Sequence, residues 1–260
     1  MPQPFIEDDL FEQKFRVEFS DPSQGKVRSP YTLTGSDLFA ADQRDQILDR
    51  FKDLIEAPSR DVAASLFAKW YTLPMAALYA MSRYQYGIDV SPERLRVRVD
   101  KWPYFLVEET GASVCPQEGR EQWRADLLRQ LFSRHVDPLY RSLAEYSGLS
   151  IHAFWAHTAY VIGYWYPLWI SQTESQPVQQ SLRMDYRFLT QEAPAELFGP
   201  YDKNPLSTRF RTIEHPAEPD NQVRIRKQCC FIYKLPSVGR CCYTCPRLTE
   251  EERVERLQTL

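Results

Sequence analysis

Glycine, histidine and long apolar stretches are all scarce in this sequence. Its 260 residues include only 9 glycines and 4 histidines, and no glycine-rich phosphate loop is present. The longest apolar run, 160–170, is interrupted by Gly163 and Pro167. It is much shorter than the roughly 20 residues that a helix needs to span a bilayer. We therefore expect no transmembrane helix, and at most a peripheral association with membranes.

The sequence also lacks a strong excess of one charge. It has 32 Lys and Arg residues against 35 Asp and Glu residues, a net charge of −3, which does not favour nucleic acid as a partner. The first residues, MPQPFIEDDLFEQKF, are acidic and lack the basic and apolar regions of a secretory signal. We expect a cytoplasmic protein, in which thiols stay reduced.

The composition is that of an ordinary globular chain, with 26% charged and 43% hydrophobic residues. A chain of this length buries roughly 70–75% of its unfolded surface, so folding does not require a disulfide or a metal. We expect one domain over residues 1–260. Within it, residues 1–34 are proline-containing and weakly periodic, which predicts an irregular lead segment. Residues 223–260 form the C-terminal segment.

Periodicity predicts a mainly helical α+β fold with a small antiparallel β element. Leu95, Val97 and Val99 alternate with polar residues, which predicts a strand that pairs with 104–107 in a hairpin. Residues 171–222 are rich in polar residues and proline, and we expect loops and short helices there. Residues 223–227 are a candidate strand. The predicted helices cover 36–57 after a Ser36 cap, 59–87 with a kink at Pro74 and a stop at Gly87, 119–147 divided at 137–138, and 151–165 after a Ser150 cap.

Cysteine is unusual in its placement. There are six cysteines, five of them between 229 and 245, while Cys115 stands alone. In a reducing compartment such a group indicates a metal site rather than disulfides. Four thiolates suit either a structural zinc ion or an iron–sulfur cluster.

The spacing of these cysteines leaves both metal centres open. Only Cys242-x-x-Cys245 has the spacing of a zinc knuckle. Cys229 and Cys230 are adjacent, and neighbouring side chains of an extended chain point to opposite faces. A two-iron cluster is wider than a single ion and accommodates adjacent ligands more readily.

Basic residues surround the cysteines, and no Asp or Glu lies between Val223 and Thr249. Cations near an iron–sulfur cluster raise its reduction potential, and they attract an acidic carrier protein or an anionic ligand. The alternative is an ordinary solvated basic loop. The candidates for docking a substrate or an electron donor are Arg226, Lys227, Lys234 and Arg240.

The C-terminal segment resembles one known family, the FhuF-type ferric siderophore reductases. Those proteins end in two adjacent cysteines, a ten-residue spacer and Cys-x-x-Cys. The resemblance extends to RIRKQCC, to the Tyr-Lys-Leu-Pro of the spacer, and to FAKWYTLPMAALYA and AHTAYVIGYWY. It covers the chain loosely from about residue 60 and closely over the last 30 residues.

The resemblance implies a [2Fe–2S] cluster on Cys229, Cys230, Cys242 and Cys245. A ten-residue spacer would end at Cys241, but only Cys242 has the required spacing to Cys245. We place the ligand at Cys242 and keep Cys241 as the alternative, because one extra residue changes the entropy of loop closure little.

The resemblance further implies an enzyme that reduces ferric siderophores, of the hydroxamate type, by one electron and releases Fe(II) in the cytoplasm. A ferredoxin or a flavin reductase would supply the electron. This chemistry needs no catalytic residue separate from the cluster. The alternative function is a non-catalytic zinc-stapled binding module with a basic docking loop.

Overall fold

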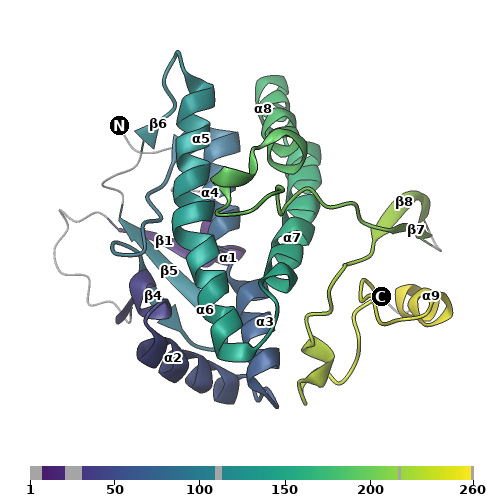
Figure 1. Ribbon diagram of the computed structural model, residues 1–260. Helices are drawn as coiled ribbons and strands as arrows, with labels where there is room; N and C mark the ends of the chain where they lie inside the picture. The colour runs from purple at the N-terminus through teal and green to yellow at the C-terminus, as the bar shows by residue number, and fades with distance from the viewer. Residues whose placement is uncertain (1–7, 21–30, 109–112, 216–217, 259–260) are drawn as a thin grey trace.

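The structure, a computed structural model, describes residues 8–20, 31–108, 113–215 and 218–258. Helices form most of the described chain and pack against a small four-stranded sheet (Figure 1). The predicted mainly helical α+β class is confirmed at this level. The helices are α1 (Leu10–Gln13), α2 (Ala41–Leu54), α3 (Arg60–Trp70), α4 (Leu73–Tyr84), α5 (Arg120–Leu131), α6 (Asp137–Ser147), α7 (Ile151–Gln172), α8 (Gln176–Arg187) and α9 (Glu250–Gln258).

The sheet has the strand order β1-β5-β4-β2. Its strands are β1 (Val17–Ser20), β2 (Leu33–Thr34), β4 (Arg96–Val99) and β5 (Pro103–Glu108). β4 and β5 form the predicted antiparallel hairpin, with Val97 opposite Phe105. β1 runs parallel to β5, so the prediction of an irregular segment over 1–34 is wrong at 17–20 and at β2. Four residues carry too little periodicity to be recognised alone, and β1 depends on a partner strand far away in sequence.

The predicted start of the helix over 36–57, with its cap at Ser36, is wrong. Ser36 lies inside a short 3-10 helix (Gly35–Leu38), and α2 begins only at Ala41. The cap belongs to Thr34, which exchanges hydrogen bonds with the turn that contains Asp37 in a capping box. A side-chain cap depends only on neighbouring residues, and here the Thr34 cap begins the short 3-10 helix rather than α2.

Pro74 begins a helix rather than kinking one. α3 ends at Trp70, and α4 restarts with Pro74 in its first turn, where the missing amide costs no hydrogen bond. α4 ends at Tyr84, and the next residue, Gln85, has a left-handed backbone conformation with φ of 55°. Gly87, the predicted stop, lies instead in β3 (Tyr86–Gly87), which pairs with β6 (Ser113–Val114).

The Ser150 cap is confirmed, because its side chain accepts a hydrogen bond from the backbone amide of His152. α7 then continues past the predicted end at residue 165, through Pro167, to Gln172. No helix in the described part of the chain has the length and apolarity needed to cross a membrane. α5 and α6 are joined by a π-helical turn (Phe132–Val136), so the predicted division at 137–138 is a change of helical pitch.

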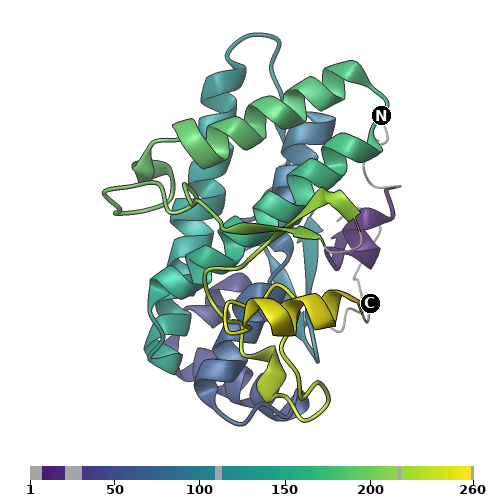
Figure 2. The same cartoon turned by 90° about the vertical axis from the view of Figure 1, so that its right-hand side faces the viewer.

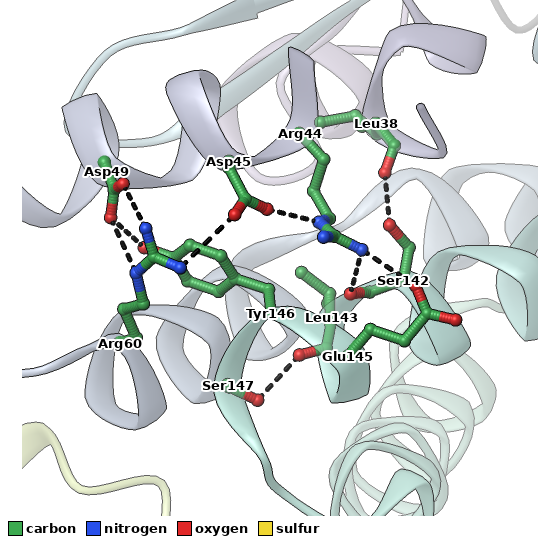
Figure 3. Close-up of polar contacts among 10 residues, drawn as sticks. All are labelled: Leu38, Arg44, Asp45, Asp49, Arg60, Ser142, Leu143, Glu145, Tyr146 and Ser147. Atoms are coloured by element: carbon green, nitrogen blue, oxygen red, sulfur yellow. Dashed lines mark hydrogen bonds and ion pairs between the residues drawn. The ribbon is translucent and has the colours of Figure 1, made fainter. Parts of the chain in front are cut away.

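A polar network joins α2, α3 and α6 (Figure 3). Arg60 at the start of α3 contacts Asp49 of α2 at 2.6 Å, and Tyr146 of α6 donates to the same carboxylate at 2.7 Å. The Arg60 guanidinium also lies over the Tyr146 ring, 4.6 Å from its centroid. The network fixes the N-terminal end of α3. Asp61, which follows Arg60, forms an ion pair with Lys234 of the cysteine-bearing segment.

The expected loop-rich region over 171–222 contains more regular structure than predicted. α8 occupies twelve of its residues, and a hairpin of β7 (Thr212–His215) and β8 (Glu218–Arg224) closes it. The predicted strand at 223–227 is confirmed only at 223–224, which end β8, and residues 225–227 lie beyond it. Beyond it, the cysteine-bearing segment and α9 lie along one side of the helices (Figures 1 and 2).

Candidate metal centre

The chain leaves β8 at Arg224 and runs directly into the cysteine-bearing segment. The backbone amide of Arg226 donates to the carbonyl of Thr244 at 3.0 Å, which brings the start of this segment beside its far end. After Cys230 the chain reverses at Phe231, whose φ of 59° is left-handed. The amide of Phe231 points back to the sulfur of Cys229 at 3.4 Å.

The second group of cysteines lies on a tight turn. The amide of Cys245 donates to the carbonyl of Cys242 at 2.8 Å, so the Cys-x-x-Cys spacing forms the compact turn expected of it. The Thr244 hydroxyl lies 3.8 Å from the Cys242 sulfur. Cys245 is buried, and Cys242 is half-buried.

The structure brings together the four cysteines predicted as ligands. The sulfurs of Cys229 and Cys245 are 3.5 Å apart. Cys230 and Cys242 are joined through Arg226, whose guanidinium donates to the Cys230 sulfur at 3.0 Å and also contacts the Cys242 sulfur. A single loop separates the Cys229–Cys230 pair from Cys242 and Cys245 along the chain.

The fifth cysteine of the group and the isolated cysteine lie elsewhere. Cys241 is half-buried and lines a cleft beside the turn, with its neighbour Cys242. Cys115 is on the loop before α5, where its thiol contacts the carbonyl of Pro116 at 3.5 Å.

Hydrogen bonds between the thiols of Cys229, Cys242 and Cys245 shift their pKa values in different directions. The bond from Cys245 lowers the pKa of Cys229 to about 7, so Cys229 ionises more readily than Cys245 or Cys242. The same bond raises the pKa of Cys245 to about 11. A bond to Cys245, together with burial, holds the pKa of Cys242 well above its usual range.

The four candidate ligand thiols do not surround a single point. Within the described residues, no three side chains of His, Cys, Asp or Glu surround one point closely enough to hold a metal ion. Two thiolates on one tetrahedral metal lie about 3.8 Å apart, given metal–sulfur bonds of about 2.3 Å. The Cys229–Cys245 separation is close to that value, whereas Arg226 separates Cys230 from Cys242. Among the described cysteines, the pair Cys229 and Cys245 therefore has the separation that a shared metal requires.

The four predicted docking residues occupy different environments. Arg226 is buried, 5% exposed, and faces the sulfurs, so its position is that of a partner for the thiols rather than a surface contact. Lys227 is exposed. Lys234 is exposed and pairs with Asp61 of α3 at 3.7 Å. Arg240 lines the cleft beside Cys241 and Cys242.

Sequence reasoning missed Arg253, which is 1% exposed. From α9 it donates to the carbonyls of Tyr243, Cys245 at 2.9 Å and Leu248 at 3.1 Å. It therefore holds the Cys-x-x-Cys turn through backbone carbonyls, whereas Arg226 contacts the sulfurs.

A local signal for α9 was present in the sequence. Thr249 and Glu252 form a capping box, with the Glu252 amide donating to the Thr249 hydroxyl at 3.2 Å and the Thr249 amide to the Glu252 carboxylate at 2.8 Å. This pattern predicts a helix start. It does not reveal which side chain turns inward.

The cleft beside the turn has a volume of about 280 Å³. We name it the basic cleft, because its lining includes Lys69 of α3, Arg240 of the cysteine-bearing segment and Arg256 of α9, together with Cys241 and Cys242. Lys69 and Arg256 were not predicted, since nothing local connects them to the cysteines.

Comparison with known proteins gives no match: no family model, no curated protein and no solved structure is similar to this chain.

Proposed function

We propose that this chain is a one-electron reductase of ferric siderophores that holds a [2Fe–2S] cluster on Cys229, Cys230, Cys242 and Cys245 and acts in the cytoplasm. The observation that carries the proposal is the pairing of these four thiols, Cys229 with Cys245 directly and Cys230 with Cys242 through Arg226. The resemblance to FhuF-type reductases supports it and suggests hydroxamate siderophores as substrates.

The chain's own residues serve this chemistry electrostatically. A cluster on these thiolates would supply one electron to Fe(III), and the chelated iron, once reduced, is held more weakly by anionic oxygen ligands. The Arg226 guanidinium donates hydrogen bonds to two of the sulfurs, which stabilises their negative charge. Arg253 fixes the turn that carries Cys242 and Cys245. An acidic ferredoxin or a flavin reductase would return the electron.

A zinc-stapled binding module remains the second candidate, because the tight turn at Cys242–Cys245 is also the form of a zinc knuckle. In that case the basic residues near the cysteines would dock an acidic partner, and no electron would be transferred.

Purification without air separates the two candidates. We expect a red-brown protein that absorbs visible light and contains two iron atoms and two acid-labile sulfides per chain. Reduction should produce the paramagnetic signal of a reduced two-iron cluster. A colourless protein with one zinc ion per chain would contradict the reductase.

A matched pair of substitutions tests the choice of ligand. Cys242→Ser should abolish iron and sulfide incorporation, whereas Cys241→Ser should leave both unchanged, because Cys242 contacts Arg226 and Cys245. The reverse result would move the ligand to Cys241.

A further inference from the structure

The basic cleft combines positive charge with immediate access to the thiols. Lys69, Arg240 and Arg256 come from three separate elements and converge on one cavity. Two candidate sulfur positions, Cys241 and Cys242, form part of the same lining. A ligand in this cavity would therefore lie against the proposed redox centre.

No acidic side chain among the described lining residues balances the positive charge of the basic cleft. Lys69 and Arg240 also form no ion pair with any Asp or Glu in the described ranges. In contrast, Lys234 on the same segment is paired with Asp61. The positive charge of Lys69 and Arg240 in this concavity favours an anionic ligand.

The size of the basic cleft limits what can enter. A volume of about 280 Å³ is just below the range of about 300–1,000 Å³ for small-molecule sites. It can receive one face of a chelate while the rest projects into solvent. Ile232 and Val238 add an apolar wall against which the carbon skeleton of a chelator can pack.

We infer that the basic cleft binds ferric chelates that carry net negative charge and present carboxylate groups, in preference to neutral tris-hydroxamates. This inference rests on the proposed function and narrows its hydroxamate substrates to those whose iron complexes are anionic. Lys69, Arg240 and Arg256 contact the carboxylates and hold the ferric centre beside the cysteine turn. The preference follows from the charge, because a neutral chelate gains nothing from three cations.

Redox-inert gallium(III) complexes test binding without electron transfer. The anionic probe is gallium(III) bound to ethylenediaminetetraacetate, and the neutral probe is gallium(III) tris(acetohydroxamate). Calorimetry on the full chain, as purified, should show tighter binding of the anionic probe, and this advantage should shrink as salt increases. Equal affinity for the two probes would overturn the inference.

Single substitutions locate the site. Lys69→Gln, Arg240→Gln and Arg256→Gln should each weaken the anionic probe about three- to fivefold and leave the neutral probe unchanged. Lys101→Gln removes the same charge from the exposed turn between β4 and β5 and should change neither affinity. If all four variants bind the anionic probe alike, the basic cleft is not its site.

The two proposals fail separately. Cluster content measures the proposed function, and gallium binding measures the cleft. A protein that contains the cluster but prefers the neutral probe keeps the reductase proposal and loses the cleft. A colourless protein that still binds the anionic probe through Lys69 and Arg240 loses the reductase proposal and keeps an anion site.

Discussion

The helical part of the molecule and the C-terminal segment are held together by different forces. The first, over residues 31–210, buries a large apolar core that includes Trp155, Trp169 and Phe105, each no more than 1% exposed. The second has a small apolar cluster of its own, centred on Val223, Ile225 and Leu257. Apolar burial of the first kind stabilises a fold without any cofactor.

The C-terminal segment instead buries arginines and thiols. Arg226 and Arg253 are both nearly inaccessible, and their hydrogen bonds go to sulfurs and to loop carbonyls. Among the described residues of this segment, Cys230 and Leu235 are buried in the main core, and Phe231 and Ile232 pack against it. Buried charge of this kind stabilises little by itself, because desolvation offsets much of the attraction. We conclude that the order of this segment depends on its polar contacts and, in the proposed function, on metal.

The largest expected effect comes from removing the metal centre. Cys245→Ser should eliminate bound iron and accelerate amide exchange in 226–248 and α9 by about tenfold or more, since these regions lose their common anchor. The far-UV spectrum and the exchange of α3 and α7 should change little. Loss of protection throughout the chain would show that the two regions fold as one unit.

A substitution in the helical core should lower the stability of the fold and leave the iron content unchanged. Trp155 is 1% exposed and donates to the Tyr201 hydroxyl at 2.8 Å. Trp155→Ala should lower the free energy of unfolding by about 4 kcal/mol, measured by urea denaturation. Trp102 is 39% exposed, and Trp102→Ala should cost about 1 kcal/mol. At temperatures where both variants are folded, iron content should match that of the unaltered protein, and a selective loss of iron in Trp155→Ala would contradict the comparison.

Acid should weaken the helical region through His135. This side chain is fully buried, with Nδ1 donating to the Val90 carbonyl at 2.6 Å and Nε2 accepting from the Tyr71 hydroxyl at 2.7 Å. Burial lowers the pKa of His135 to about 4. The unfolded chain takes up this proton near pH 6.5. The stabilisation is therefore complete above pH 6.5 and is lost as pH falls towards 4, by about 3 kcal/mol.

The His135→Gln variant isolates this contribution. It should be less stable than the unaltered protein at pH 7, yet it should lose about 3 kcal/mol less between pH 6.5 and 4. Urea denaturation at several pH values measures both quantities. Parallel pH profiles for the two proteins would show that His135 does not titrate between the folded and unfolded states.

Local signals predicted some elements and missed others for a common reason. The Ser150 cap and the β4–β5 hairpin depend on neighbouring residues, and both were predicted from the sequence. β1 depends on a parallel partner far along the chain, and it was missed. Pro74 was correctly recognised as a disturbance, but whether a proline kinks a helix or begins one depends on how the flanking turns pack.

The sequence by itself determined the chemistry available in the C-terminal segment: five cysteines, a Cys-x-x-Cys turn and a surrounding excess of positive charge. Only the tertiary structure decided how those charges are used. Arg226 turns inward to the sulfurs, Lys234 is neutralised by Asp61, and Arg240 lines the basic cleft. Lys69 joins the cleft from α3, more than 150 residues away in sequence. Folding brings such residues together through the packing of whole helices, and local sequence patterns carry no record of that packing.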